Sequence, residues 1–156
     1  MRRATLFWLA WGLIAAPWTA YLATMTLGPA LEAWAFPVRV DQRVERVVRD
    51  EDQVCWDWPS TKVRELVSDD VDAYIHFHGA RFVTGVYRAD TGQPWGATGA
   101  VGLGRRTLRY CTPLPPRVRP IDPVRIEWTA LYPGFFGTGL YRLPLKLPAV
   151  KVPAVF

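Results

Sequence analysis

The segment DDVDAYIHFHG, residues 69–79, has the clearest strand pattern in the chain. Its apolar positions are Val71, Ala73, Ile75 and Phe77, and its alternating polar positions are Asp72, Tyr74, His76 and His78. A period of two places the first set on the buried face of a β-strand and the second on the outer face. Gly79-Ala80 predicts a two-residue hairpin turn, after which residues 81–88 return as the next strand.

The sequence from residue 38 onward continues in short apolar runs separated by turn residues. Further expected strands are the valine-rich stretch from Val38, then 54–58, 62–67, 107–111, 124–131 and 139–145. No amphipathic helix interrupts them, so the expected fold is mostly β, an antiparallel β-sandwich or small barrel. Prolines recur through the tail, residues 143–156, which predicts an extended segment at a sheet edge or a polyproline II segment, not a central strand.

The N-terminal part of the chain has a different composition. The run from Ala4 to Leu31 contains no charged residue, and about 20 apolar residues span a bilayer as a helix. Arg2 and Arg3 precede the run, so the positive-inside rule predicts a cytoplasmic N-terminus and a periplasmic or extracellular C-terminal domain, anchored in the inner membrane. A cleaved signal peptide ending at Ala33-Trp34-Ala35 is the alternative, but its apolar core is usually only about 7–15 residues long.

These features divide the chain into five expected segments. They are a cytoplasmic tip (1–3), a single transmembrane helix (4–28), an interfacial linker (29–38), an exported β domain (39–142) and the proline-rich tail (143–156). Gly28-Pro29 is the expected end of the membrane span, and Pro17 is expected to kink it.

Small residues recur at every fourth position of the N-terminal run. They are Gly12, Ala16, Ala20, Thr24 and Gly28. On a helix they form one stripe that lets another helix approach closely, which predicts a helix-packing surface. The alternative is that small residues are simply common in membrane helices.

The two cysteines, Cys55 and Cys111, predict one disulfide in an oxidising compartment, with two buried free thiols as the alternative. The formal net charge is +5, and without Arg2 and Arg3 the remaining 17 basic and 14 acidic residues leave only +3. That balance argues against a dedicated nucleic-acid binder. We therefore expect no nucleic-acid partner.

Few residues suggest chemistry. His76 and His78 stand roughly 6.5–7 Å apart on one strand face and are weak candidates for a metal site, but a metal needs three or four ligands. The sequence therefore predicts a solvated or partner-facing strand and no metal. The glycine-rich stretch GATGAVGLGRR, residues 96–106, is followed by a strand-like segment where a phosphate cradle would require a helix. We expect neither a cofactor nor an enzyme activity.

The aromatic stretch LYPGFFGTG, residues 131–139, places two phenylalanines between glycines. Phe135 and Phe136 are expected either to contact a partner or the bilayer, or to plug the core. Trp34 is expected to contact a partner or the bilayer as well.

Three motifs give a resemblance to a group of proteins. CWDWPSTKVR (55–64), YC (110–111) followed by LPP (114–116), and YRLPLKLPAVKVP (141–153) resemble segments of small membrane-anchored, uncharacterised proteins of phage and proteobacterial genomes. The resemblance covers most of the β domain and implies no activity.

Together these features predict a single-pass inner-membrane accessory or scaffold subunit. It would associate with other membrane protein chains and the lipid bilayer through its helix and exported β domain. The alternative is a membrane-anchored binding module for a small ligand, a metal ion or a glycan.

Overall fold

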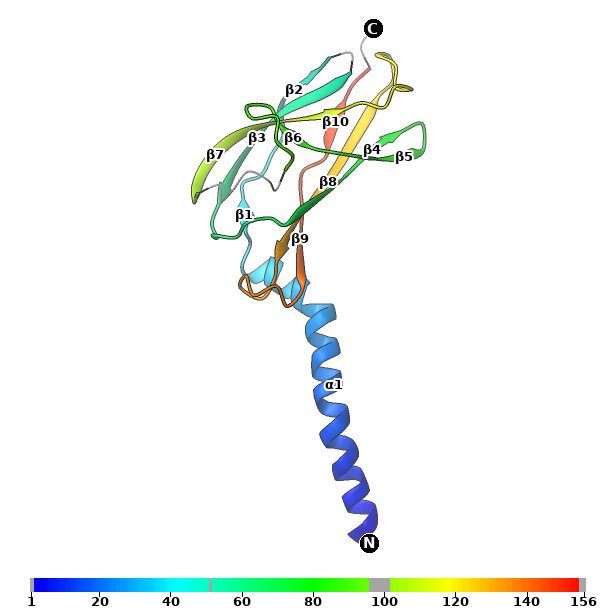
Figure 1. Ribbon diagram of the computed structural model, residues 1–156, viewed down its shortest axis with the longest axis vertical. Helices are drawn as coiled ribbons and strands as arrows, with labels where there is room; N and C mark the ends of the chain where they lie inside the picture. The colour runs from blue at the N-terminus through cyan, green and yellow to red at the C-terminus, as the bar shows by residue number, and fades with distance from the viewer. Residues whose placement is uncertain (1, 51, 96–101, 155–156) are drawn as a thin grey trace.

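The computed structural model describes residues 2–50, 52–95 and 102–154. One long helix, α1 (Arg2–Ala35), leads into a β domain. Figure 1 shows the helix projecting from one end of the β domain, with the N-terminus far from the sheets and the C-terminus at the opposite end of the molecule. The helix continues through both Pro17 and Pro29, so it does not end at Gly28-Pro29 as the sequence suggested.

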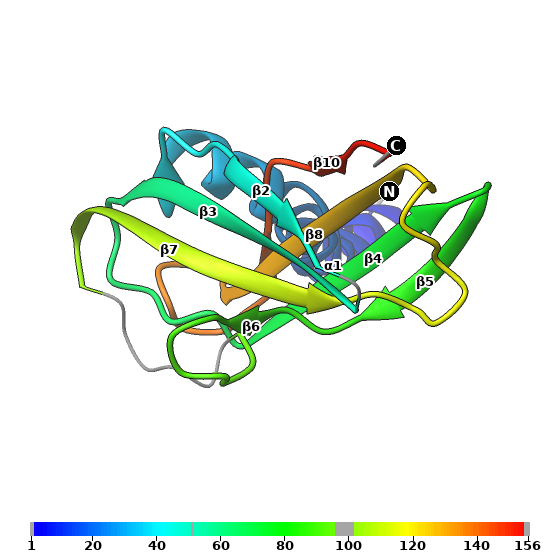
Figure 2. The same cartoon turned by 90° about the horizontal axis from the view of Figure 1, so that it is seen from above.

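The described strands form two five-stranded antiparallel sheets (Figure 2). The first sheet contains β1 (Arg39–Val40), β2 (Glu45–Arg49), β3 (Gln53–Lys62), β6 (Tyr87–Arg88) and β7 (Gly104–Pro113). The second contains β4 (Asp70–Phe77), β5 (Ala80–Thr84), β8 (Val124–Pro133), β9 (Arg142–Lys146) and β10 (Val150–Val152). The prediction of a mostly β fold with antiparallel sheets is confirmed.

The β4–β5 hairpin confirms the period-two strand but corrects its turn. His78 and Gly79 occupy the turn with φ angles of 48° and 77°, and His76 pairs with Arg81. Two consecutive residues in the left-handed conformation form a turn whose twist matches that of the two flanking strands. Histidine adopts this conformation more readily than most residues other than glycine. A turn at Gly79-Ala80 would have paired His78 with Arg81, so the register shifts by two residues. The side chains of residues 71–77 therefore keep their predicted faces, whereas His78 leaves the strand for the turn. Ala73 and Ile75 are accordingly buried.

Tryptophans join the two sheets. Trp128 of β8 packs edge to face against Trp56 and Trp58 of β3, with ring centroids 5.2 and 5.3 Å apart. All three side chains are buried. Such contacts between opposite sheets are what a sandwich-like core requires.

The described part of the proline-rich tail, residues 143–154, contains two short strands at a sheet edge, one of the two alternatives expected from the sequence. Both β9 and β10 pair with β8, on the side opposite to β4. Pro144 within β9 costs no hydrogen bond with a further strand, because β9 is an edge strand.

The predicted membrane anchor is wrong. Within the residues that the structure describes, no helix combines the length and the apolar character needed to cross a bilayer. This finding contradicts the inner-membrane localisation, the transmembrane helix 4–28 and the orientation derived from them.

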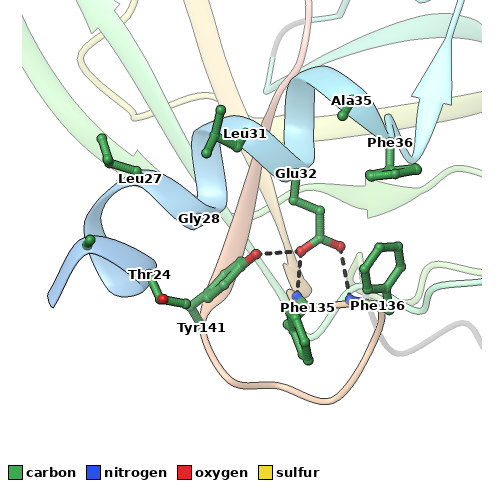
Figure 3. Close-up of a pocket in the computed structure, with 11 residues that line it drawn as sticks. Thr24, Leu27, Gly28, Leu31, Glu32, Ala35, Phe36, Phe135, Phe136 and Tyr141 are labelled. Carbon is green, nitrogen blue, oxygen red and sulfur yellow. Dashed lines mark hydrogen bonds between the residues drawn. The ribbon is translucent and has the colours of Figure 1, made fainter. Parts of the chain in front are cut away.

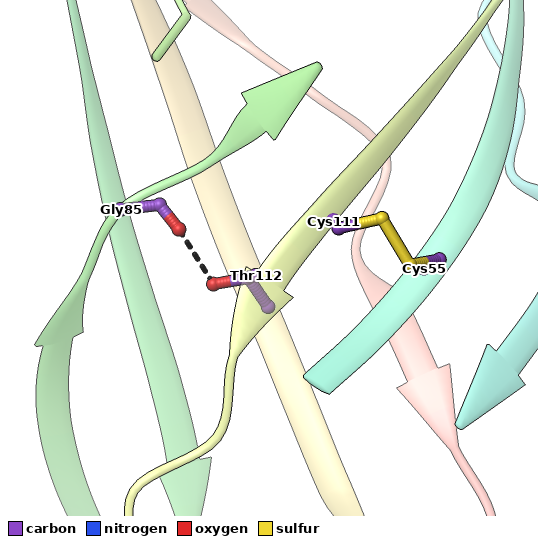
Figure 4. The surroundings of a disulfide bond; sticks show 4 residues. All are labelled: Cys55, Gly85, Cys111 and Thr112. Atoms are coloured by element: carbon purple, nitrogen blue, oxygen red, sulfur yellow. Dashed lines mark hydrogen bonds between the residues drawn. A yellow bond between two sulfur atoms is a disulfide. The ribbon is translucent and has the colours of Figure 1, made fainter. Parts of the chain in front are cut away.

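The disulfide between Cys55 and Cys111 is confirmed. It joins directly opposed positions of β3 and β7, with the two Cα atoms 4.0 Å apart (Figure 4). Beside it, the buried hydroxyl of Thr112 donates to the carbonyl of Gly85 at 2.7 Å. That bond ties β7 to the segment where the chain passes from the second sheet to the first.

Removing the disulfide is expected to lower stability without preventing folding. The bridge closes a loop with a sequence separation of 56 residues. Chain entropy gives about 4 kcal/mol for a loop of this size. The β3–β7 pairing extends from Gln53 to Lys62 and holds the two strands together without the bridge. In urea unfolding, the Cys55→Ala/Cys111→Ala variant should unfold cooperatively at a lower urea concentration than the oxidised wild type. Wild-type protein in excess dithiol is expected to have the same midpoint as the variant. A midpoint equal to that of the oxidised protein would contradict the expectation.

Candidate helix–loop docking site

A buried carboxylate fixes the end of α1 to the β domain. Glu32 is 6% exposed and faces residues 134–141, which connect β8 to β9 and are called here the aromatic loop. The backbone amides of Phe135 and Phe136 donate to the carboxylate at 2.5 and 3.1 Å, and the Tyr141 hydroxyl donates at 2.8 Å (Figure 3). A single side chain of the helix therefore accepts hydrogen bonds from three donors of one loop.

Arg64, in the segment between β3 and β4, supplies the fourth donor. Its Nη2 lies 2.7 Å from Glu32 Oε1, and both side chains are largely buried. Its Nη1 donates to the carbonyl of Phe36 at 2.7 Å, and its guanidinium carbon lies 5.4 Å from the ring centre of Phe136. The arginine thus contacts the carboxylate, the end of the helix and the aromatic loop at once.

These contacts determine the charge state of Glu32. Burial acts to raise the pKa of Glu32, while the bonds from Arg64, Tyr141, Phe136 and Phe135 lower it. The hydrogen bonds together outweigh the effect of burial, and the pKa of Glu32 lies below its ordinary value of 4.5. At neutral pH the site therefore contains an ionised carboxylate whose two oxygens are fully engaged.

The aromatic loop has an unusual backbone. Phe135 and Phe136 have φ angles of 50° and 54°, in the left-handed region that bulky side chains seldom adopt. Each such residue costs on the order of 1–3 kcal/mol and persists only where its surroundings enforce it. This conformation directs both amides toward Glu32 and leaves the two rings 48% and 60% exposed. Of the two alternatives from the sequence, the core plug is therefore excluded.

Two glycines make room for Tyr141. A Cβ at Gly134 would lie 2.3 Å from the tyrosine ring, and one at Gly28 would lie 2.8 Å from it. Gly28, the last residue of the small-residue stripe, therefore accommodates a side chain of its own β domain. The tyrosine ring lies against the helix there and carries its hydroxyl to Glu32 (Figure 3).

An open apolar pocket of about 460 Å³ lies between α1 and the aromatic loop. One face of the helix forms the first wall, and the aromatic loop forms the second. The lining residues are Ala23, Thr24, Leu27, Gly28, Leu31, Glu32, Ala35, Phe36, Phe135, Phe136 and Tyr141. We call this pocket the helix–loop groove.

The other predicted contact residues lie on the helix surface. Gly12, Ala16, Ala20 and Thr24 are exposed, and the Thr24 hydroxyl donates to the carbonyl of Ala20 at 2.8 Å. Trp34 is 83% exposed. Their role in packing against another chain remains a prediction.

The two histidines have separate partners. His76 Nε2 lies 3.2 Å from Glu127 Oε2, and His78 Nε2 lies 3.1 Å from Asp122 Oδ1. In the part of the chain that the structure describes, no three His, Cys, Asp or Glu side chains are placed to hold a metal ion. Within the glycine-rich stretch, residues 96–101 lie outside the described residues, and residues 104–106 belong to β7.

Reasoning from the sequence missed Glu32, Arg64 and Tyr141. Glu32 carried one signal, since it is the first charged residue after 28 uncharged ones, and it was interpreted only as the end of the run. Comparisons with protein-family models, with curated proteins and with solved structures find no match to this chain. The function is therefore argued from the geometry alone.

Proposed function

We propose that the chain is an accessory or scaffold subunit that associates with other protein chains through α1 and the aromatic loop. The helix supports this, because the part of it nearest the β domain exposes large apolar side chains. Leu27 and Leu31 are each more than half exposed and line the groove described above. Exposed apolar patches of this kind mark contact sites.

The helix–loop groove is the part of this surface that most clearly fits a partner. Among the described residues that line it, Glu32 is the only ionised group, and its oxygens already accept four hydrogen bonds. An occupant therefore gains nothing from a charge and must present an uncharged apolar face. The wall from Ala23 to Phe36 is about 20 Å long at 1.5 Å per residue. Ala23 and Ala35 let a second backbone approach closely, so an apolar helix of a partner chain fits the groove.

The strained phenylalanines are the observation that carries the proposal. Phe135 and Phe136 are held in an unfavourable backbone conformation with their side chains about half exposed. Large exposed aromatics near the centre of a patch are the usual anchors of protein interfaces. Because Glu32 and Arg64 fix the loop to α1, these rings keep a defined position relative to the helix, as a scaffold surface needs.

A charge placed in the groove is expected to release the partner. Leu31→Glu puts a carboxylate on the groove wall, where partner binding would desolvate it. Leu22→Glu is the matched control, because Leu22 is similarly exposed (55% against 61%) and does not line the groove. Purification of the tagged chain from its source cells, followed by quantitative mass spectrometry, should recover a stoichiometric partner with wild type and with Leu22→Glu. With Leu31→Glu the recovery should fall at least about tenfold, the equivalent of 1.4 kcal/mol.

Two outcomes would contradict the proposal. If no chain copurifies stoichiometrically with wild type, the association function is wrong. If a partner copurifies but Leu31→Glu retains it as well as Leu22→Glu does, the groove is not the contact, and the partner is bound elsewhere on the chain.

A further inference from the structure

We propose that the aromatic loop and Arg64 form a carboxylate-binding site of the β domain, which Glu32 of α1 occupies in this structure. The site recognises the carboxylate group itself. It therefore accepts a small free carboxylate when the Glu32 side chain is removed. This inference concerns the isolated chain and does not require the partner proposed above.

The donors match a planar group with two oxygens. Oε1 of Glu32 receives Arg64 Nη2 at 2.7 Å and the Phe136 amide at 3.1 Å. Oε2 receives the Phe135 amide at 2.5 Å and the Tyr141 hydroxyl at 2.8 Å. Each oxygen thus has two donors, and Figure 3 shows the three donors of the loop gathered around one carboxylate. Consecutive amides that point to one side form an anion-binding concavity, and the arginine supplies the opposite charge.

The loop holds this shape through bonds that do not involve Glu32. The Gly134 amide donates to the Tyr141 carbonyl at 2.7 Å, and the Gly139 amide donates to the Gly134 carbonyl at 3.1 Å. The Thr138 amide and hydroxyl both donate to the Phe135 carbonyl, at 3.1 and 3.0 Å. The left-handed residues therefore lie inside a loop that is closed by its own backbone. Removal of one side chain from the helix leaves these bonds in place.

Arg64 and Tyr141 are also positioned by other contacts. The Arg64 guanidinium lies over the ring of Phe136, which belongs to the aromatic loop itself. The Tyr141 ring fits against Gly134 of the same loop, where a Cβ would clash with it. Donors held in place before binding lose little freedom when the ligand arrives, which is the condition for binding a small ion.

The experiment uses the full chain with Glu32→Ala, labelled with ¹⁵N, at neutral pH. Formate is titrated while the amide signals of Phe135 and Phe136 are followed. We expect both signals to shift saturably with formate and not with formamide, its neutral counterpart. In Glu32→Ala/Arg64→Ala the formate affinity should fall at least about tenfold, because a charge-assisted bond is lost. In wild type the same titration should give no saturable shift, because the tethered Glu32 has a much higher effective concentration.

Shifts that rise linearly with formate and equal those of chloride at the same ionic strength would overturn the proposal. If Glu32→Ala does not fold, the wild-type protein still tests it. Its Phe135 and Phe136 amide signals must then titrate together below pH 4.5, with Glu32, and their failure to do so refutes the site. Neither result depends on whether a stoichiometric partner is found, so the two proposals fail separately.

Discussion

Replacing Glu32 by alanine is expected to detach the end of α1 from an otherwise folded β domain. The change removes the acceptor of four hydrogen bonds and leaves the partly buried Arg64 without its carboxylate. Breaking a buried ion pair by removing one partner costs about 3–5 kcal/mol. The β domain keeps its own core and its disulfide, so the loss should fall on helix docking.

Hydrogen exchange measured by mass spectrometry distinguishes local from global loss. Residues 28–36 should lose protection in Glu32→Ala, while β3, β7 and the amides of Gly134, Thr138 and Gly139, which are bonded within the loop, keep theirs. Glu45→Ala is a suitable control, because Glu45 forms only an exposed ion pair with Arg43. Exposed pairs contribute at most about 1 kcal/mol, so this control should exchange like wild type. Equal protection of the helix end in wild type and Glu32→Ala would show that other contacts hold the helix.

The same carboxylate gives the docking a pH dependence. The pKa of Glu32 is lowered in the docked state, against an ordinary value of 4.5. Docking therefore favours the ionised form of Glu32. The full contribution of Glu32 to docking is present above pH 4.5 and is lost as the pH falls through the lowered pKa. Glu32→Gln, which cannot ionise, should show weak docking at every pH. A wild-type protein whose helix remains equally protected in acid would contradict this linkage.

The strands were predictable where local patterns determine them. Residues 69–77 alternate because one face of β4 packs on the core, and Ala73 and Ile75 are buried as that pattern required. The edge position of the tail followed from its prolines. The turn was misplaced because His78 adopts a left-handed conformation that glycine more often supplies. Which two residues form the turn depends on how the two whole strands pair, and the dipeptide Gly79-Ala80 alone does not determine it.

The docking site was harder to predict because it is non-local. Glu32 meets the aromatic loop across a separation of 103 residues to Phe135, and no periodicity in either segment indicates the contact. The membrane prediction failed for another reason. Absence of charge was treated as apolar character, and the helix is not apolar enough to cross a membrane. The loop did carry a readable signal, two phenylalanines between glycines, and their exposure follows from the left-handed backbone.

Trp128→Ala is expected to destabilise the whole β domain and not the docking alone. Trp128 is 2% exposed and lies at the centre of the core, where it joins the two sheets. Its ring centroid lies 5.2 to 5.5 Å from those of Trp56, Trp58, Trp95 and Tyr110. Truncating a buried tryptophan to alanine costs about 3–5 kcal/mol, because it removes apolar contacts and leaves a cavity. The disulfide joins β3 and β7 within the first sheet, so it does not hold the two sheets together.

Urea unfolding monitored by far-ultraviolet circular dichroism measures this cost without relying on tryptophan emission. Trp34→Ala is the matched control, because Trp34 is 83% exposed and its loss should change stability by less than about 0.5 kcal/mol. Trp128→Phe separates packing from hydrogen bonding. It retains a ring in the core but loses the bond from Nε1 to the Pro148 carbonyl, 2.9 Å long, which ties the tail to β8. We expect a smaller loss for phenylalanine than for alanine, together with faster hydrogen exchange in β10. A Trp128→Ala variant as stable as Trp34→Ala would mean that the tryptophan cluster does not hold the two sheets together.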